Sequence, residues 1–239
     1  MIDRLPEYPN FNDIVTLPWD RWALTADWHC PFVNKKLFKE LLKQCRRHKI
    51  KHLVIGGDFL DLNAFSKFFQ LTRVRWAEEK EYARQVLQIL QGAFKEIYFM
   101  ASNHEMRYLK AFQHGCMGEK DDLFDMLSFD NKHVIWHNKM RVGNWMIIHP
   151  RTARRLQLSF ARSIAPQYPG LHIALAHGHL QGLTTTENGK QWLLDIGMMG
   201  DPDKFEYVNI NQTSYQHWVS GAALIDGDNP PHLLWGNRL

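Results

Sequence analysis

The sequence lacks the features that mark membrane proteins and disulfide-stapled secreted domains. Its 239 residues include only three cysteines, Cys30, Cys45 and Cys116, at no regular spacing. An odd, unpatterned set argues against a disulfide framework and against a Cys-based zinc site, and it favours a reducing compartment. No apolar run approaches the roughly 20 residues that cross a bilayer, and the N-terminus lacks the apolar core of a signal peptide. We therefore expect a soluble, cytoplasmic protein that does not enter the membrane.

The chain also lacks internal repeats, low-complexity tracts and Gly/Ser-rich linkers. Its length fits one domain over residues 1–239, and apolar residues make up 45% of the chain, enough for a sizeable core. The formal net charge of +4 is mildly basic. Such a balance permits an anionic substrate but does not demonstrate one.

Strand and helix patterns alternate in the first half of the chain. Strands are predicted over 21–29, 51–58 and 95–105, separated by amphipathic helices over 35–49 and 75–94. This β-α-β-α-β order predicts parallel strands with right-handed crossovers. The second half is richer in strand patterns, so an α/β core completed by a second sheet is expected. The later strands are predicted over 139–150, 171–179, 190–197, 221–227 and 231–237.

Polar side chains stand where most of these strands end. The tips are Asp27-Trp28-His29, Asp58 with Asp61, Asn103-His104-Glu105, His149, and His177-Gly178-His179. Open α/β sheets bind ligands beyond the carboxyl ends of their strands, and these nitrogen and oxygen donors suit divalent transition metals. A cluster of such groups left unpaired in a closed site would be costly. The tips therefore predict a bound pair of metal ions.

The spacing within two tips supports shared ligation. Asp27 and His29 are two residues apart, and on an extended backbone such side chains point the same way, so both can reach one ion. His177 and His179 have the same spacing, although a turn there could send them to different ions. Taken singly, Asp27 and Asp58 could instead be helix N-caps, and the histidines could be ordinary strand-end or turn residues.

The ordered set of tips resembles the calcineurin-like metallophosphoesterases. DWH (27–29), GGDFLD (56–61), SNHE (102–105), His149 and HGH (177–179) follow the order of that family's motifs, over residues 22 to about 180. The spacers and C-terminal strands look like those of the small phosphoesterases of bacteria and phages. The resemblance implies a four-layer α-β-β-α sandwich of two mixed sheets, with a dinuclear metal site at the C-terminal ends of the strands.

The resemblance also assigns roles to individual residues. One metal would be held by Asp27, His29 and His179, the other by Asn103, His149 and His177, and Asp58 would bridge them. His104 would face the substrate as general acid, and Asp61 would accept a hydrogen bond from His104 and keep it protonated. The implied reaction is hydrolysis of phosphate esters, chiefly phosphodiesters, by in-line attack of a hydroxide held between two ions. The mixed donors favour Mn²⁺, with Fe and Zn²⁺ left open.

Several positions depart from the family pattern. Ser102 and Ala176 stand where the family has glycine, and we expect both turns to survive with modest strain. Pro150 follows His149 where many relatives have glycine. Leu62 stands where the protein-phosphatase branch has an arginine that clamps phosphate. The departure at Leu62 argues against a protein phosphatase.

Other features leave alternatives open. Arg107 and Arg151 are candidate substrate contacts, although a helix salt bridge is an equal reading of Arg107. The run 151–162 could grip a polyanion such as DNA or form a solvated helix face. The segment 63–76 could wall the pocket or pair two chains in a homodimer. Alternative functions are a DNA exonuclease or endonuclease of the same superfamily, and a non-catalytic scaffold; the substrate could be a nucleotide or nucleic acid.

Overall fold

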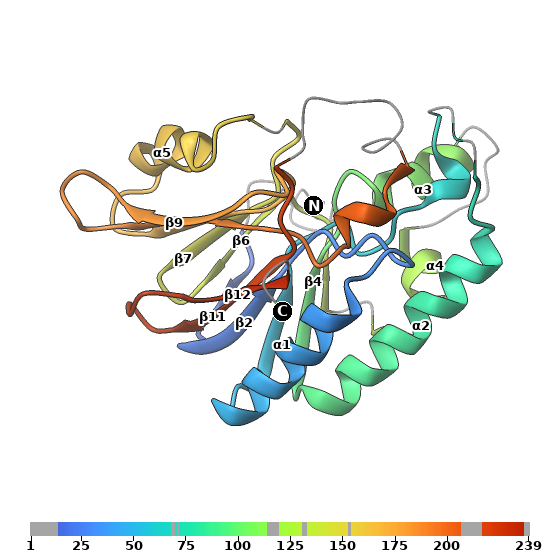
Figure 1. Cartoon of the computed structure of the whole chain (residues 1–239), viewed down its shortest axis with the longest axis horizontal. Coiled ribbons are helices and arrows are strands. Elements are labelled where there is room, and N and C mark those ends of the chain that lie inside the picture. Colours follow the sequence, from blue (N-terminus) through green and yellow to red (C-terminus); the bar gives the residue numbers. More distant parts are fainter. Residues whose placement is uncertain are drawn as a thin grey trace, which may run out of the picture.

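The computed structural model describes residues 14–67, 70, 72–113, 120–130, 133–152, 154–206 and 217–236. Within these residues the strands form two six-stranded sheets that lie face to face (Figure 1). Cys116 and residues 207–216 lie outside the described residues. No helix in the described part of the chain is long and apolar enough to cross a membrane.

The first sheet has the order β12-β11-β2-β3-β4-β5. Its parallel strands are β2 (Arg21–Thr25), β3 (His52–Ile55), β4 (Glu96–Met100) and β5 (Val134–Ile135). Helices α1 (Lys35–Arg47) and α2 (Trp76–Ala93) connect β2 to β3 and β3 to β4. The predicted β-α-β-α-β unit with parallel strands is therefore confirmed. The antiparallel strands β11 (Gly221–Asp226) and β12 (His232–Trp235) extend the sheet beyond β2.

The second sheet has the order β1-β6-β7-β8-β10-β9. Its strands are β1 (Thr16–Leu17), β6 (Lys139–Val142), β7 (Trp145–Ile148), β8 (His172–Leu175), β9 (Gln181–Thr185) and β10 (Trp192–Ile196). The predicted strand 139–150 is in fact the antiparallel hairpin β6–β7. It turns at Gly143, where φ is +53° and a Cβ atom would lie 2.8 Å from the Trp19 carbonyl oxygen. The sequence signals had also missed β9.

Three apolar layers separate four layers of secondary structure. Side chains such as Trp22, Val54 and Ile147 fill the space between the sheets. The apolar faces of α1 and α2 pack on the outer face of the first sheet, and the helix α5 (Ser159–Ile164) packs on the second. In Figure 1, α1, α2 and α4 cover one side of the molecule and α5 lies at the other. The expected α-β-β-α sandwich of two mixed sheets is confirmed.

The helices begin and end where local chemistry dictates. The Asn34 side chain accepts hydrogen bonds from the Lys36 and Leu37 amides, and this cap starts α1. The helix ends at the cap residue His48, one residue before Lys49 adopts a left-handed conformation with φ of +55°. The remaining helices are α3 (Glu105–Gln113) and α4 (Lys120–Asp125), with 3-10 turns at Asn63–Phe65, Ala165–Gln167 and Pro202–Lys204.

Most of the strands stop short of the polar tips, although His149 directly follows β7. β4 ends at Met100, so Ser102, Asn103 and His104 lie in a loop that leads into α3. The tips after β2 and β3 likewise form loops rather than strand ends. As a result, the candidate ligands are carried by short loops at one edge of both sheets.

Candidate metal centre

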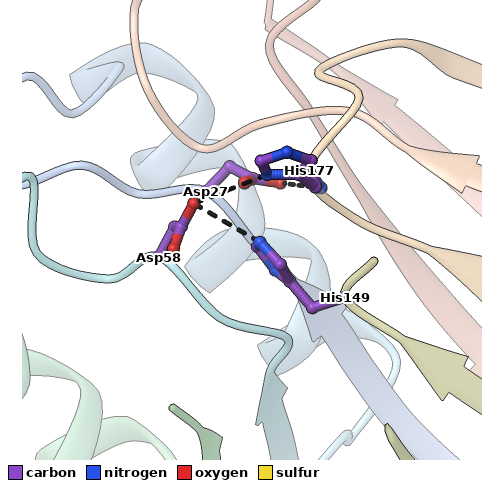
Figure 2. Close-up of side chains that lie close together, drawn as sticks. All are labelled: Asp27, Asp58, His149 and His177. Carbon is purple, nitrogen blue, oxygen red and sulfur yellow. Dashed lines mark hydrogen bonds and ion pairs between the residues drawn. The ribbon is translucent and has the colours of Figure 1, made fainter. Parts of the chain in front are cut away.

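Loops from both sheets bring the polar tips to one place. Asp27 and His29 follow β2, Asp58 and Asp61 follow β3, and Asn103 and His104 follow β4, all in the first sheet. The second sheet contributes His149 after β7, and His177 and His179 after β8. Figure 2 shows Asp27, Asp58, His149 and His177 directed toward one another from these separate loops.

One group of donors contains Asp27, His29 and His179, whose candidate ligand atoms all lie within 4.8 Å of one another. Asp27 Oδ1 lies 3.3 Å from His179 Nε2 and 3.9 Å from His29 Nε2. The two imidazole nitrogens are 3.3 Å apart. All three side chains are buried, so one carboxylate oxygen and two ring nitrogens converge on a point away from solvent.

A second group gathers around Asp58. Its Oδ2 lies 3.4 Å from His149 Nε2 and 3.9 Å from His177 Nδ1. Asn103 Oδ1 lies 3.0 Å from His149 Nε2. Asp58 also belongs to a cluster with His29 and His104. Asp27 joins Asp58, His149 and His177 in a further cluster, so the Asp58 carboxylate, together with that of Asp27, stands between the two groups of donors.

Contacts outside the two groups fix which atoms face inward. His149 Nδ1 donates a hydrogen bond to the Gly56 carbonyl oxygen at 2.8 Å, so the ring presents Nε2 to the centre. Asp27 Oδ2 accepts from the His177 amide at 2.9 Å and leaves Oδ1 inward. Asp27 Oδ1 and His177 Nδ1 are buried without a hydrogen-bond partner among the described residues. Unpartnered buried oxygen and nitrogen atoms of this type fit a pair of divalent metal ions.

The backbone of these loops adopts left-handed torsion angles, which are unfavourable for residues that carry a Cβ atom. Five of the seven candidate ligands have positive φ, namely Asp27 (52°), His29 (45°), Asp58 (48°), His177 (70°) and His179 (53°). For a residue with a Cβ atom this conformation costs on the order of 1–2 kcal/mol, and such strain clusters at functional sites. Ser102 and Ala176 do not have positive φ. The strain expected at those two positions is therefore absent, and the ligands carry it instead.

Ser102 has a role that its glycine-like position did not predict. Its hydroxyl accepts a hydrogen bond from the Asp58 amide at 2.7 Å and donates to Asp58 Oδ1. The Ser102 amide donates to Glu105 Oε2 at 3.0 Å. The serine therefore ties the loop after β4 to the carboxylate between the two donor groups.

Two buried glutamates hold the loop that carries Asp58 and Asp61. Glu105 Oε1 accepts from the amides of Phe59 at 3.0 Å and Leu60 at 3.2 Å. Glu79, from α2, accepts from the amides of Leu62 at 2.6 Å and Asn63 at 3.2 Å. Burial, with Asp61 nearby, raises the pKa of Glu79 to about 8.

The sequence interpretation had missed Glu79 and given Glu105 no role. The available signal was the position of Glu79, an acid on the buried face of α2 in line with Ala83, Val86 and Leu90. A carboxyl group on an apolar face requires hydrogen-bond partners, and here they are the buried backbone amides of a ligand loop.

The contact expected between Asp61 and His104 is different in the structure. His104 Nδ1 donates to the main-chain oxygen of Asp61 at 2.7 Å, whereas the Asp61 carboxylate lies 3.7 Å away. That carboxylate is closer to His29, at 3.3 Å from Nδ1. The Asp61 amide donates to the Cys30 carbonyl oxygen, which draws Asp61 toward the loop after β2. The Asp61 carboxylate thus lies beside His29, a candidate metal ligand, while the Asp61 main-chain oxygen holds the imidazole of His104.

Arg107 contacts the other side of His104. Its guanidinium donates to the Asp61 main-chain oxygen at 2.9 Å, and Nη2 lies 2.9 Å from His104 Nε2. Burial lowers the pKa of His104 to about 4, and the positive charges of His29 and Arg107 act in the same direction. The contact with the Asp61 main-chain oxygen places the proton of the neutral imidazole on Nδ1, and the role of Asp61 in keeping His104 protonated stays a prediction. No carboxylate of the described residues forms an ion pair with Arg107, so the helix salt bridge is not seen.

The charged groups of the centre shift one another's pKa values. Burial opposes ionisation of Asp58, but His104 and His149 outweigh it and hold the pKa of this carboxyl well below its usual range. Burial likewise opposes protonation of His149, yet Asp58 raises its pKa to about 9. The site therefore concentrates negative charge that attracts protons or metal ions.

Aromatic side chains line one flank of the first donor group. The rings of His179 and Trp218 are 4.1 Å apart, and those of His29 and Phe205 are 5.3 Å apart, both edge to face. The residue in the sequence position of the protein-phosphatase arginine is Leu62, which is uncharged and fully buried. Arg151, the other candidate substrate contact, is exposed two residues after His149.

Comparison with known proteins agrees with this arrangement. A model of the calcineurin-like phosphoesterase family matches residues 21–235. The chain belongs to this family. This calcineurin-like phosphoesterase is accordingly a metal-dependent hydrolase of phosphate esters, with a candidate dinuclear His/Asp site. A search of curated proteins found no significant match.

Solved structures are similar to this chain at low sequence identity. Hypothetical protein PH1004 from Pyrococcus horikoshii OT3 aligns over 90% of this phosphoesterase and 87% of that chain, with 10% identity and a TM-score of 0.54. An archaeal phosphodiesterase covers 90% and 99% of the two chains, with 11% identity and a TM-score of 0.49. The phosphoesterase YfcE from E. coli covers 87% and 89%, with 14% identity and a TM-score of 0.45.

Proposed function

We propose that this phosphoesterase cleaves phosphodiesters with two divalent ions, Mn²⁺ foremost and Fe or Zn²⁺ as alternatives. The first ion would be held by Asp27, His29 and His179, the second by Asn103, His149 and His177, with Asp58 bridging both. The observation that carries the proposal is the convergence of buried, unpartnered donors such as Asp27 Oδ1 and His177 Nδ1. The mixed imidazole, carboxylate and amide donors suit these ions better than Ca²⁺ or Mg²⁺.

The chain's own groups would position and protonate the substrate. When bound, a pair of divalent ions supplies a water nucleophile near neutral pH and positive charge against the phosphoryl oxygens. His104 sits beside Asp58 at the edge of the centre, where Arg107 contacts its Nε2. A phosphate group would draw the Arg107 guanidinium to itself, release Nε2 and favour protonation of the imidazole. His104 would then donate that proton to the leaving oxygen as general acid.

Two features favour diesters over phosphoproteins. The buried Leu62 leaves the position of the protein-phosphatase clamp without a positive charge. A diester carries less negative charge than a monoester and requires less neutralisation. Arg107 and Arg151 would then be the main cationic contacts for the substrate.

The bridging role of Asp58 provides the first test. We expect Asp58→Asn to lose both ions, because one carboxylate would serve two sites. Metal content is measured after loading with Mn²⁺ and gel filtration, with the exposed Asp226→Asn as matched control. Two ions retained by Asp58→Asn would exclude the bridging role. The wild-type protein is also assayed with a chromogenic monoester and a chromogenic diester, with each metal and with chelator. If no metal gave more hydrolysis than chelator, the enzymatic proposal would be overturned and a scaffold favoured.

The role of His104 is tested by leaving-group dependence. We expect His104→Ala to keep its metal ions and to lose about 10²–10⁴-fold in turnover on diesters with poor leaving groups. The loss should be smaller for a p-nitrophenolate leaving group, which needs little protonation. An equal loss for both kinds of ester, or a variant isolated without metal, would contradict the general-acid role.

A further inference from the structure

One long stretch of the chain is devoid of acidic residues. Residues 131–186 contain no Asp or Glu, although they include Lys132, Lys139, Arg141, Arg151, Arg154, Arg155 and Arg162. Four of these, Arg151, Arg154, Arg155 and Arg162, are exposed and lie between His149 and the end of α5. We call these four residues the arginine strip. The mild net charge of the whole chain conceals this local excess.

The strip begins at the metal centre and leads away from it. The loop that follows His149 rises from the edge of both sheets and runs to α5 at the outer side of the second sheet (Figure 1). Arg151 is two residues from His149, a span of at most about 7 Å, and Arg155 is six residues away, at most about 21 Å. The arginines can therefore contact a ligand that extends from the centre toward α5.

The loop is fixed to the sheet beneath it. The Leu158 amide donates to Asp195 Oδ2 at 2.5 Å, and the Gln157 side chain donates to the Gln181 carbonyl oxygen. The Arg154 guanidinium lies over the Phe160 ring at 5.0 Å. Contacts of this kind reduce the conformational entropy that binding would cost.

Three residues of the strip, Arg151, Arg154 and Arg162, carry positive charge that no carboxylate of the described residues neutralises. Within the described residues, Arg151, Arg154 and Arg162 form no ion pair with a carboxylate, whereas Arg21 and Arg75 elsewhere on the surface pair with Asp226 and Glu78. Asp195, which contacts the loop, is mostly buried and accepts the Leu158 amide. The guanidinium groups of Arg151, Arg154 and Arg162 are therefore exposed to solvent, where they can bind phosphate.

An apolar side chain interrupts the strip. Leu156 is 75% exposed, more than the other exposed large hydrophobic residues, Ile89 at 50% and Val15 at 39%. It lies next to Arg155 in the sequence. An apolar side chain beside a row of guanidinium groups offers van der Waals contact to flat groups that alternate with phosphates, as the bases of a nucleic acid strand do.

We propose that the arginine strip binds the phosphates of a single nucleic acid strand whose scissile phosphate lies at the metal centre. The proposal rests on the proposed phosphodiesterase function and names its substrate class. The strip is continuous with a centre that would cleave phosphoesters, and this favours a nucleic acid strand as the ligand. An anionic membrane surface could bind the strip without any of its phosphates reaching the buried metal ligands. Each phosphate neutralised in this way contributes about 0.7 to the salt dependence of binding.

The test compares two charge-matched triple variants. The first is Arg154→Gln/Arg155→Gln/Arg162→Gln; the control is Lys39→Gln/Arg46→Gln/Arg47→Gln on the exposed face of α1. Binding of a fluorescent single-stranded oligonucleotide is followed by anisotropy in chelator, so that no cleavage occurs. We expect the first variant to bind at least about tenfold more weakly and to lower the salt slope by about 2. The control should match the wild type.

Turnover provides the second readout. The ratio of kcat/KM for the oligonucleotide to kcat/KM for a small chromogenic diester should fall at least tenfold in the first variant and stay constant in the control. An unchanged salt slope, or equal losses in both variants, would overturn the proposal. So would binding of phosphatidylserine vesicles through the strip without binding of the oligonucleotide. Absence of any metal-dependent turnover in the wild type would refute the proposed function alone, because oligonucleotide binding is measured in chelator.

Discussion

Replacing Ser102 with alanine removes a hydroxyl that contacts Asp58, the proposed bridging residue, at its amide and at its carboxylate. The Asp58 amide donates to Ser102 Oγ, and the same hydroxyl donates to Asp58 Oδ1. Both residues are buried, so the amide would lose its acceptor in a site with little access to solvent. The carboxylate would also lose a charge-assisted hydrogen bond.

The magnitude follows from these two losses. An unsatisfied buried donor costs about 1–3 kcal/mol, and a hydrogen bond to a charged group is worth about 1.5–3 kcal/mol, so we expect a total of about 2–4 kcal/mol because the two overlap. For a protein of this size, such a loss in the free energy of unfolding lowers Tm by roughly 5–15 °C. Loss of a contact that orients a ligand typically weakens metal binding about 10–100-fold.

The assay measures both quantities. Thermal unfolding in chelator gives the stability change, and titration with Mn²⁺ gives the affinity. Ser163→Ala is the matched control, because its exposed hydroxyl donates only to the Phe160 carbonyl oxygen. Ser102→Gly should lose at least as much as Ser102→Ala. If Ser102→Ala kept wild-type stability and metal affinity, the hydroxyl would not hold Asp58 and the reasoning would be refuted.

Three further predictions concern the loops and their charges. Gly57→Ala would place a Cβ atom 2.4 Å from His149 Nδ1 at a φ of +104°, so we expect impaired metal binding and a loss of about 2 kcal/mol or more, whereas Gly92→Ala in α2 should bind metal normally. Lys49→Gly, at a φ of +55°, should raise the free energy of unfolding by about 0.5–1 kcal/mol, and a lower Tm would contradict this. Asp58 raises the pKa of His149 to about 9 against the effect of burial, so a proton occupies this ring at neutral pH and metal must displace it. Apparent Mn²⁺ affinity should therefore fall about tenfold per unit as pH drops from about 8 to 6, and a flat profile would exclude this competition.

The sequence predicted the elements whose signals are local. Strand and helix periodicity located β2, β3, β4, α1 and α2, and the polar tips marked the loops that converge. The hairpin β6–β7 was read as one strand, because alternation continues across Gly143 and Asn144 even though this pair is a turn signal. Local patterns therefore gave the architecture but not every turn.

Contacts between distant segments were the part that sequence reasoning could not supply. The Asp61 carboxylate lies nearer His29 than His104 because its amide is bound to the Cys30 carbonyl oxygen, a pairing across two loops. Glu79 reaches the Leu62 and Asn63 amides from a different helix. Such choices depend on the relative placement of loops, and no spacing in the sequence encodes it.

The left-handed backbone of the candidate ligands has a consequence for how the protein would exchange its ions. Asp27, His29, Asp58, His177 and His179 adopt torsions that isolated peptides avoid. Chelation would remove the bonds that offset this cost, so the ligand loops should open before the sheets do. Amide hydrogens in these loops would then exchange with solvent soon after chelator is added, while those of β3 and β4 stay protected.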